Sequence, residues 1–299
     1  MSSINIISKD ITKNTTLFRH KPYLITKEVH VRSGITLSIQ DGTLIFILNG
    51  VVTNSKLKRA ALIFDSGSRM KAKKFTIRAG SLSFKPEKIQ NNGGIWFCGN
   101  HRSASKDNIS IQHSPRKITS KYKALEIKTF YLGRIDSIQK SSKKNIKQQS
   151  KKSDDIDGIS VLGVGRNEWE VKTLKAYYSG DDGLDLTNSD IQVDSVYIKE
   201  PVEDGFNISS SRIQVRKNLS VIMPKNGEDC DLFDLETDDG ASYVEINKGC
   251  KLNLDGVFGD QLNLSSKDMP PLKKSKKSRY RFKGSNKQAD SLIFSITED

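Results

Sequence analysis

Short runs of alternating apolar and polar residues fill most of the chain, and helical periodicity is nearly absent. β-branched and aromatic residues dominate these runs, and Gly, Asp, Asn or Ser bound them, which is typical of strands joined by turns. The first clear runs lie at 23–25, 29–31, 35–39 and 43–48. The pattern therefore predicts an all-β chain.

An Asp-Gly pair followed by a strand recurs in the middle of the chain. Copies begin at Asp157, Asp182 and Asp204, with the sequences DGISV, DGLDL and DGFNI, and a degenerate copy begins at Asp229. The three glycines stand 25 and 22 residues apart, and the intervals hold further short strands. Asp-Gly suits a turn, because Asp bonds its own backbone and Gly adopts positive φ at no steric cost. Repeats of this length indicate a solenoid, and the LxxLxLxxN pattern of leucine-rich repeats is missing.

Two segments carry a family resemblance. PYLITKEVHVRSGITLSIQDGTLIFI at 22–47 resembles the first coils of right-handed parallel β-helix proteins, and NNGGIWFCGN at 91–100 resembles a further coil. The resemblance implies a right-handed parallel β-helix, in which coils stack and parallel sheets run along the rod. Inward side chains then fill the bore, and outward side chains form exposed faces.

We predict a single β-helix domain over residues 1–299. The first 20 residues are expected to cap the N-terminal end, because open coils would otherwise pair with other molecules. Residues 137–155 are polar, lysine-rich and unpatterned, so we expect a basic loop inserted between coils. Residues 265–287 are predicted to form a second basic loop or tail, followed by a last strand at 292–296.

Charge and cysteine content bear on the partner and the compartment. The chain has 49 Lys and Arg against 35 Asp and Glu, and this net charge of +14 favours an anionic partner or, more simply, solvated lysine-rich loops. The three cysteines show no CxxC spacing and the four histidines no ligand spacing, so both are expected to be structural. No secretory signal and no apolar run of about 18 residues is visible, which favours a cytoplasmic or virion-associated protein without membrane insertion.

The candidate chemistry centres on residues 179–186, with the sequence SGDDGLDL. The carboxylates of Asp181, Asp182 and Asp185 can converge on one hard cation, and calcium prefers such oxygen ligands. Asp157 belongs to the preceding copy of the repeat, so stacking of coils at ~4.8 Å would bring it alongside. These four residues are the predicted calcium ligands. The alternative is a plain turn whose acidic side chains face solvent.

The GDDGxD sequence is similar to the calcium site of β-helix pectate lyases. The resemblance implies that calcium neutralises a uronate carboxylate and that a basic side chain removes the adjacent proton in β-elimination. Those lyases place a lysine after a Gly-Phe pair, whereas this chain has Asn207 there, and Asn is not a Brønsted base. The residues expected at the site are Asp182, Asp204 and Lys225 for catalysis, and Asn207, Arg212 and Lys217 for substrate binding.

The remaining charged stretches leave several functions open. The acidic stretch EDCDLFDLETDD at 228–239 offers paired carboxylates like those of β-helix glycosidases, or a solvated turn. Lys and Arg crowd 56–78, 140–152 and 273–281, although no nucleic-acid motif accompanies them. The predicted function is binding of an acidic polysaccharide, with or without cleavage by elimination or hydrolysis. The alternatives are a non-enzymatic adhesin, virion or assembly protein, as a monomer or homo-oligomer, and nucleic-acid binding through the basic loops.

Overall fold

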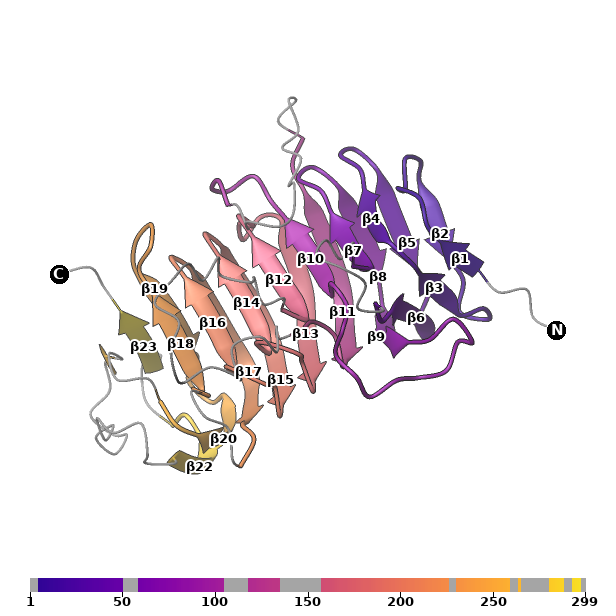
Figure 1. Ribbon diagram of the computed structural model, residues 1–299. Coiled ribbons are helices and arrows are strands. Elements are labelled where there is room, and N and C mark those ends of the chain that lie inside the picture. The colour runs from indigo at the N-terminus through magenta and orange to yellow at the C-terminus, as the bar shows by residue number, and fades with distance from the viewer. Residues whose placement is uncertain are drawn as a thin grey trace, which may run out of the picture.

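The computed structural model describes residues 5–50, 59–104, 118–134, 157–225, 230–258, 263–264, 280–287 and 292–296. Within those ranges the chain forms strands and no helix, so the all-β prediction is confirmed there. The strands lie side by side along an elongated body, from the indigo N-terminal end to the yellow C-terminal end (Figure 1). The described residues contain no helix that is long and apolar enough to cross a membrane.

The strands form two sheets, of 16 and 7 strands. We call the 7-stranded sheet face 1, and all of its neighbouring strands are parallel. Its strands follow the order β4 (Glu28–Val31), β7 (Ala61–Phe64), β10 (Ile95–Cys98), β12 (Ile159–Leu162), β14 (Leu184–Thr187), β16 (Phe206–Ser209) and β18 (Phe233–Glu236).

The 16-stranded sheet divides into two faces, because its long strands contribute their two halves to different ladders. The long strands are β11 (Lys121–Phe130), β13 (Trp169–Tyr177), β15 (Asp190–Lys199) and β17 (Arg212–Ile222). Their first halves form face 2 with β2 (Thr15–Leu17), β5 (Thr36–Ile39), β8 (Arg69–Ala72) and β19 (Ser242–Ile246). Their second halves form face 3 with β1 (Asn5–Ile7), β3 (Tyr23–Ile25), β6 (Thr43–Leu48), β9 (Lys74–Gly80) and β20 (Lys251–Gly256).

A slip in the alternation of buried side chains marks the corner between faces 2 and 3. In β11 the buried positions are Ala124 and then Ile127, and in β13 they are Val171 and then Leu174. Side chains in a regular strand alternate strictly between its two sides. A slip in this alternation accompanies a bend in the strand, so that side chains on the next face again point into the interior. Three faces in each repeat, stacked in parallel, are compatible with a β-solenoid.

The two ends of the described fold differ. At the N-terminal end, β1 and β2 extend faces 3 and 2 as further parallel strands. At the C-terminal end, β22 (Tyr280–Ser285) pairs antiparallel with β20, and β23 (Leu292–Ile296), the strand predicted there, pairs antiparallel with β19 and with β21 (Asn263–Leu264). The predicted insert at 137–155 and most of the predicted basic segment at 265–287 lie outside the described residues.

The bore holds one continuous apolar core of inward side chains from all three faces. In its N-terminal half, the Phe64 and Phe97 rings stack with centroids 5.1 Å apart, and Tyr122 and Trp169 meet Phe97 edge-on. Such aromatic pairs contribute ~0.5–1.5 kcal/mol beyond their burial. Stacked coils therefore bury a core although the whole chain is only 35% hydrophobic.

The glycines of the Asp-Gly turns are needed for a reason that the repeat did not reveal. Positive φ was the expected reason, but Gly158, Gly183 and Gly205 are not among the positive-φ residues. A Cβ on Gly183 would instead lie 2.7 Å from the carbonyl oxygen of Gly205, one coil further along. A Cβ on Gly205 would likewise lie 2.6 Å from the carbonyl oxygen of Leu232. Close stacking of successive coils, and not turn geometry, excludes a side chain here.

Candidate functional site

The Asp-Gly turns lead from face 3 into face 1, and they stack on one another. Ser160 of β12 pairs with Asp185 of β14, so Asp157 and Asp182, three residues before each, occupy equivalent places in adjacent coils. Oxygens of Asp157, Asp181 and Asp182 all lie within 4.8 Å of one another. These three side chains, which we call the aspartate group, are only 1–5% exposed. Three of the four predicted calcium ligands therefore converge.

Burial, followed by repulsion from neighbouring carboxylates, disfavours the ionised form of Asp182 in the aspartate group. Burial, together with the negative charges of Asp157, Asp181 and Asp204, raises the pKa of Asp182 well above its usual value. One hydrogen bond opposes this shift, because the Asp204 backbone N–H donates to Asp182 Oδ1 at 2.8 Å. A cation bound beside Asp182 would therefore favour the ionised form of its carboxylate.

The donors and spacing of the aspartate group fit a calcium ion. Ligand oxygens of one calcium ion lie at most ~4.6–5.2 Å apart, from the usual metal–oxygen distances, and the oxygens of the aspartate group, all within 4.8 Å of one another, are close enough to share an ion. A set made only of carboxylate oxygens also favours a hard cation. The buried group can thus hold a metal ion.

Asp185, the fourth predicted ligand, lies apart from that group. It is 2% exposed and lies in β14 between Ser160 of β12 and Asn207 of β16. The Ser160 hydroxyl donates to Asp157 Oδ2 at 3.1 Å, so a polar line leads from the aspartate group onto face 1. The same line continues through Asn207 to Asp234 of β18. Asn207 thus lies beside Asp185, where its Oδ1 accepts no hydrogen bond from the described residues.

Asp204 occupies the next Asp-Gly turn, directly after Asp182. Burial, with the negative charges of Asp234 and Asp231, raises the pKa of Asp204 to about 8, although the Asp231 N–H donates to Asp204 Oδ1 at 2.6 Å. Asp182 and Asp204 therefore both receive a backbone hydrogen bond from the following coil. Lys225, the third predicted catalytic residue, is exposed after β17 and forms no hydrogen bond or ion pair with the described residues.

The other predicted substrate ligands are distributed around the coil. Arg212 begins β17 on face 2, where its guanidinium lies 4.8 Å from the centre of the Tyr243 ring. Lys217 lies at the corner between faces 2 and 3 and pairs with Asp194 at 2.8 Å. Asn207 belongs to face 1. Each face takes about five residues of a coil, so neighbours in sequence point in different directions.

Sequence reasoning missed a group of aromatic residues on the outer side of face 3. Arg78, Phe130, Tyr177 and Lys199 are neighbours on the successive strands β9, β11, β13 and β15. The Phe130 and Tyr177 ring centroids are 5.1 Å apart, and the Arg78 guanidinium lies 5.4 Å from the Phe130 ring. We use the name aromatic ladder for the partly exposed rings of Phe130, Tyr131, Tyr177, Tyr178 and Tyr197.

Cations accompany the other rings of the ladder in the same way. Tyr131 and Tyr178 stack with centroids 4.8 Å apart, and Lys199 Nζ lies 5.4 Å from the Tyr178 ring. Lys175 Nζ lies 5.4 Å from the Tyr197 ring. Each contact is within the ~6 Å range of cation–π attraction. The similar pairs FYLG at 130–133 and YYSG at 177–180 are the signal in the sequence, but their equivalence becomes clear only from the strand register.

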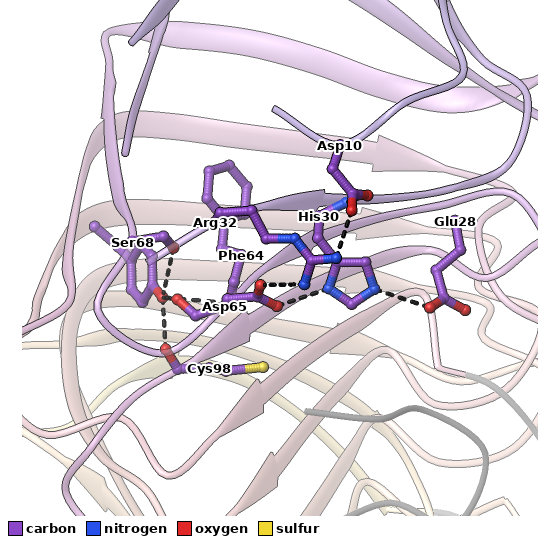
Figure 2. A network of polar contacts seen from close by, with 9 residues as sticks. Asp10, Glu28, His30, Arg32, Phe64, Asp65, Ser68 and Cys98 are labelled. Carbon is purple, nitrogen blue, oxygen red and sulfur yellow. Dashed lines mark hydrogen bonds and ion pairs between the residues drawn. The ribbon is translucent and has the colours of Figure 1, made fainter. Parts of the chain in front are cut away.

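A partly buried ionic network lies at the N-terminal end of face 1 (Figure 2). His30 Nδ1 contacts Asp65 Oδ1 at 2.6 Å and His30 Nε2 contacts Glu28 Oε1 at 2.8 Å. Arg32 binds both Asp65, at 3.0 Å, and Asp10. Burial, the largest single effect, lowers the pKa of His30, but Asp65 and Glu28 together raise it to about 9. With both ring nitrogens bonded to carboxylates, His30 joins neighbouring coils, in line with the structural role expected for it.

No protein-family model, no curated protein and no solved structure matches this chain. Its function is therefore argued from its own residues.

Proposed function

We propose that this chain is a right-handed parallel β-helix, similar in architecture to pectate lyases, that binds an acidic polysaccharide on face 3. The observation that carries the proposal is the aromatic ladder with its interleaved cations. Partly exposed rings provide flat apolar surfaces that pack against the C–H faces of sugar rings. Arg78, Lys128 and Lys199 lie between or beside those rings on the same face and complement carboxylate groups.

The direction of the ladder favours a polymer over a single sugar. Its members come from successive coils, so equivalent side chains repeat at ~4.8 Å along the long axis. A linear chain lying along that axis meets a ring or a cation at each step. Several weak contacts on one polymer then add up to useful avidity.

Calcium has a structural place in this proposal. The aspartate group, nearly inaccessible to solvent, would hold the ion through Asp157 of one coil and Asp181 and Asp182 of the next. The ion would favour the ionised form of Asp182, whose pKa is otherwise raised. It would tie two coils together without touching the polysaccharide.

Binding, and not cleavage, is the function we propose. Asp182 is buried and Asp204 half-buried, both accept backbone hydrogen bonds, and both have raised pKa values. Both lie in the Asp-Gly turns that lead from face 3 into face 1, whereas the Phe130 and Tyr177 rings lie on strands of face 3. The predicted base, Lys225, makes no contact with either aspartate.

Isothermal titration calorimetry with polygalacturonate and with neutral dextran tests the proposal. We expect polygalacturonate to bind, dextran to bind at least tenfold more weakly, and F130A/Y177A to lose most of the affinity. Y243A is the matched control, because Tyr243 is a partly exposed ring under Arg212 on face 2. Unchanged binding by F130A/Y177A would contradict the proposal. Tighter binding of a single-stranded oligonucleotide than of polygalacturonate would replace it with nucleic-acid binding, in which rings stack on bases.

A further inference from the structure

A shallow groove of about 820 Å³ lies at the corner between faces 2 and 3, in the N-terminal half of the chain. We call it the corner groove. Its volume is within the range of small-molecule sites, ~300–1,000 Å³. Its lining residues are Arg19, Ile39, Gln40, Asp41, Lys71, Ala72, Lys73 and Lys123. Four cations therefore face one carboxylate.

The register of the sheet brings like charges together beside this groove. Lys71 of β8 pairs with Lys123 of β11, and Arg69 pairs with Lys121 in the same two strands. Side chains of paired residues on neighbouring strands lie within interaction range, so two adjacent cationic pairs repel each other. Glu170 offsets part of this charge through Lys121 at 3.0 Å and Lys123 at 3.2 Å.

Among the described residues, three of the four groove cations have no carboxylate as an ion-pair partner. Arg19, Lys71 and Lys73 form no ion pair with any described residue. All three border one concave surface, so a single multiply charged anion can contact them together. A phosphate group offers the oxygens for this, because Arg binds it through two parallel N–H bonds and Lys binds it as a point charge.

The remaining walls of the groove are ordered and not purely basic. The Asp41 carboxylate accepts the Lys74 N–H at 3.2 Å, and the Gln40 side-chain oxygen accepts the Arg19 N–H at 3.2 Å. Buried Ile39 and half-buried Ala72 provide an apolar floor. An acidic and an amide side chain beside the cations suit a ligand that also carries hydroxyl donors.

We propose that the corner groove binds a small phosphate monoester of a polyhydroxy compound, such as a hexose phosphate. Arg19, Lys71 and Lys73 hold the phosphate, Asp41 and Gln40 receive hydroxyl groups, and Ile39 and Ala72 contact the carbon skeleton. The groove is separate from the aromatic ladder, because Lys123 and Phe130 lie on opposite sides of the bend in β11. The proposal therefore does not depend on polysaccharide binding.

Calorimetry on the full chain at 150 mM salt, with glucose 6-phosphate, glucose and inorganic phosphate, tests this site. We expect glucose 6-phosphate to bind, phosphate to bind at least fivefold more weakly, and glucose not to bind. K71A/K73A should weaken glucose 6-phosphate binding at least tenfold. K172A/K251A removes the same charge from exposed strand positions outside the groove and should leave binding unchanged.

The alternative outcomes each have a definite meaning. Equal weakening in K71A/K73A and K172A/K251A would show general attraction to a basic protein and overturn the site. Equal affinity for phosphate and glucose 6-phosphate would overturn recognition of the sugar. Circular dichroism of each variant confirms folding. F130A/Y177A should bind glucose 6-phosphate normally, so failure of this proposal and failure of polysaccharide binding can be distinguished.

Discussion

His30 should make the stability of the protein depend on pH in the alkaline range. Its pKa is about 9 in the folded protein, because Asp65 and Glu28 bind both ring nitrogens, against 6.5 for an unperturbed histidine. Between these two values the folded state holds a proton that the unfolded state has released. Stability from this group is therefore complete below pH 6.5 and is lost as the pH rises through 9. The variant H30Q removes the titrating group and most of this dependence.

The size of the effect follows from the shift. Each pKa unit corresponds to ~1.4 kcal/mol, so a rise from 6.5 to about 9 sets an upper limit of ~3.5 kcal/mol. Solvent screens part of it, because Glu28 at one end of the network is 39% exposed. Exposed ion pairs contribute only ~0–1 kcal/mol. We expect a loss of ~1–2 kcal/mol in the free energy of unfolding between pH 6.5 and 9.5.

Urea unfolding at half-unit steps from pH 6 to 10, in EDTA, measures this loss. Asp204 also has a raised pKa, and its contribution changes with pH in wild type and H30Q alike, so the difference between the two proteins isolates His30. H20Q is the matched control, because His20 is exposed and forms no ion pair with a described residue. A pH slope in H30Q equal to that of the wild type would refute the argument.

Three further predictions test the stacked turns. The Asp204 pKa is raised to about 8, so Asp204 lowers the free energy of unfolding as the pH rises from 4 to 8, and D204N should remove this loss. Urea unfolding at pH 8.5 should show D204N to be more stable than wild type, and a less stable variant would contradict the prediction. The melting temperature in 1 mM calcium should be several degrees higher than in EDTA. D181N should abolish this shift and the control D41N should keep it, whereas an equal shift in D181N would exclude the aspartate group as the calcium site. G183A should lower the free energy of unfolding in urea by ~1–3 kcal/mol, because its Cβ would lie 2.7 Å from the Gly205 carbonyl oxygen. Unchanged stability would mean that the coils move apart freely.

The Asp-Gly repeat predicted the spacing of the coils because the chain returns to the same turn once in each coil. It also predicted that Asp157 stacks on Asp182, since equivalent repeat positions are neighbours in a solenoid. The corner between faces 2 and 3 escaped prediction, because the strand is continuous there and only the phase of burial slips. The antiparallel pairing of β22 and β23 escaped as well, because a strand sequence does not specify the direction of its partner.

The stacking of coils also explains which of the predicted site residues lie together. Asp157, Asp181 and Asp182 converge because stacking alone brings them together. Asp185 does not join them, since it lies on a strand after the turn. Residues chosen by proximity in sequence, such as Arg212 and Lys217, point from different faces, because a coil turns every five residues or so.

Coil position, and not motif, identifies the surface to which we assign function. Phe130 and Tyr131 occupy the same places in one coil as Tyr177 and Tyr178 in the next. The sequence hides this equivalence, because residues 135–156 separate the two pairs and the interval no longer matches the repeat of 22–25 residues. The strand register shows the equivalence of the two pairs. The same register places Arg78 and Lys199 at the two ends of the row that contains Phe130 and Tyr177. In a solenoid, an insertion leaves the stacking intact while it removes the periodicity by which a binding surface is recognised.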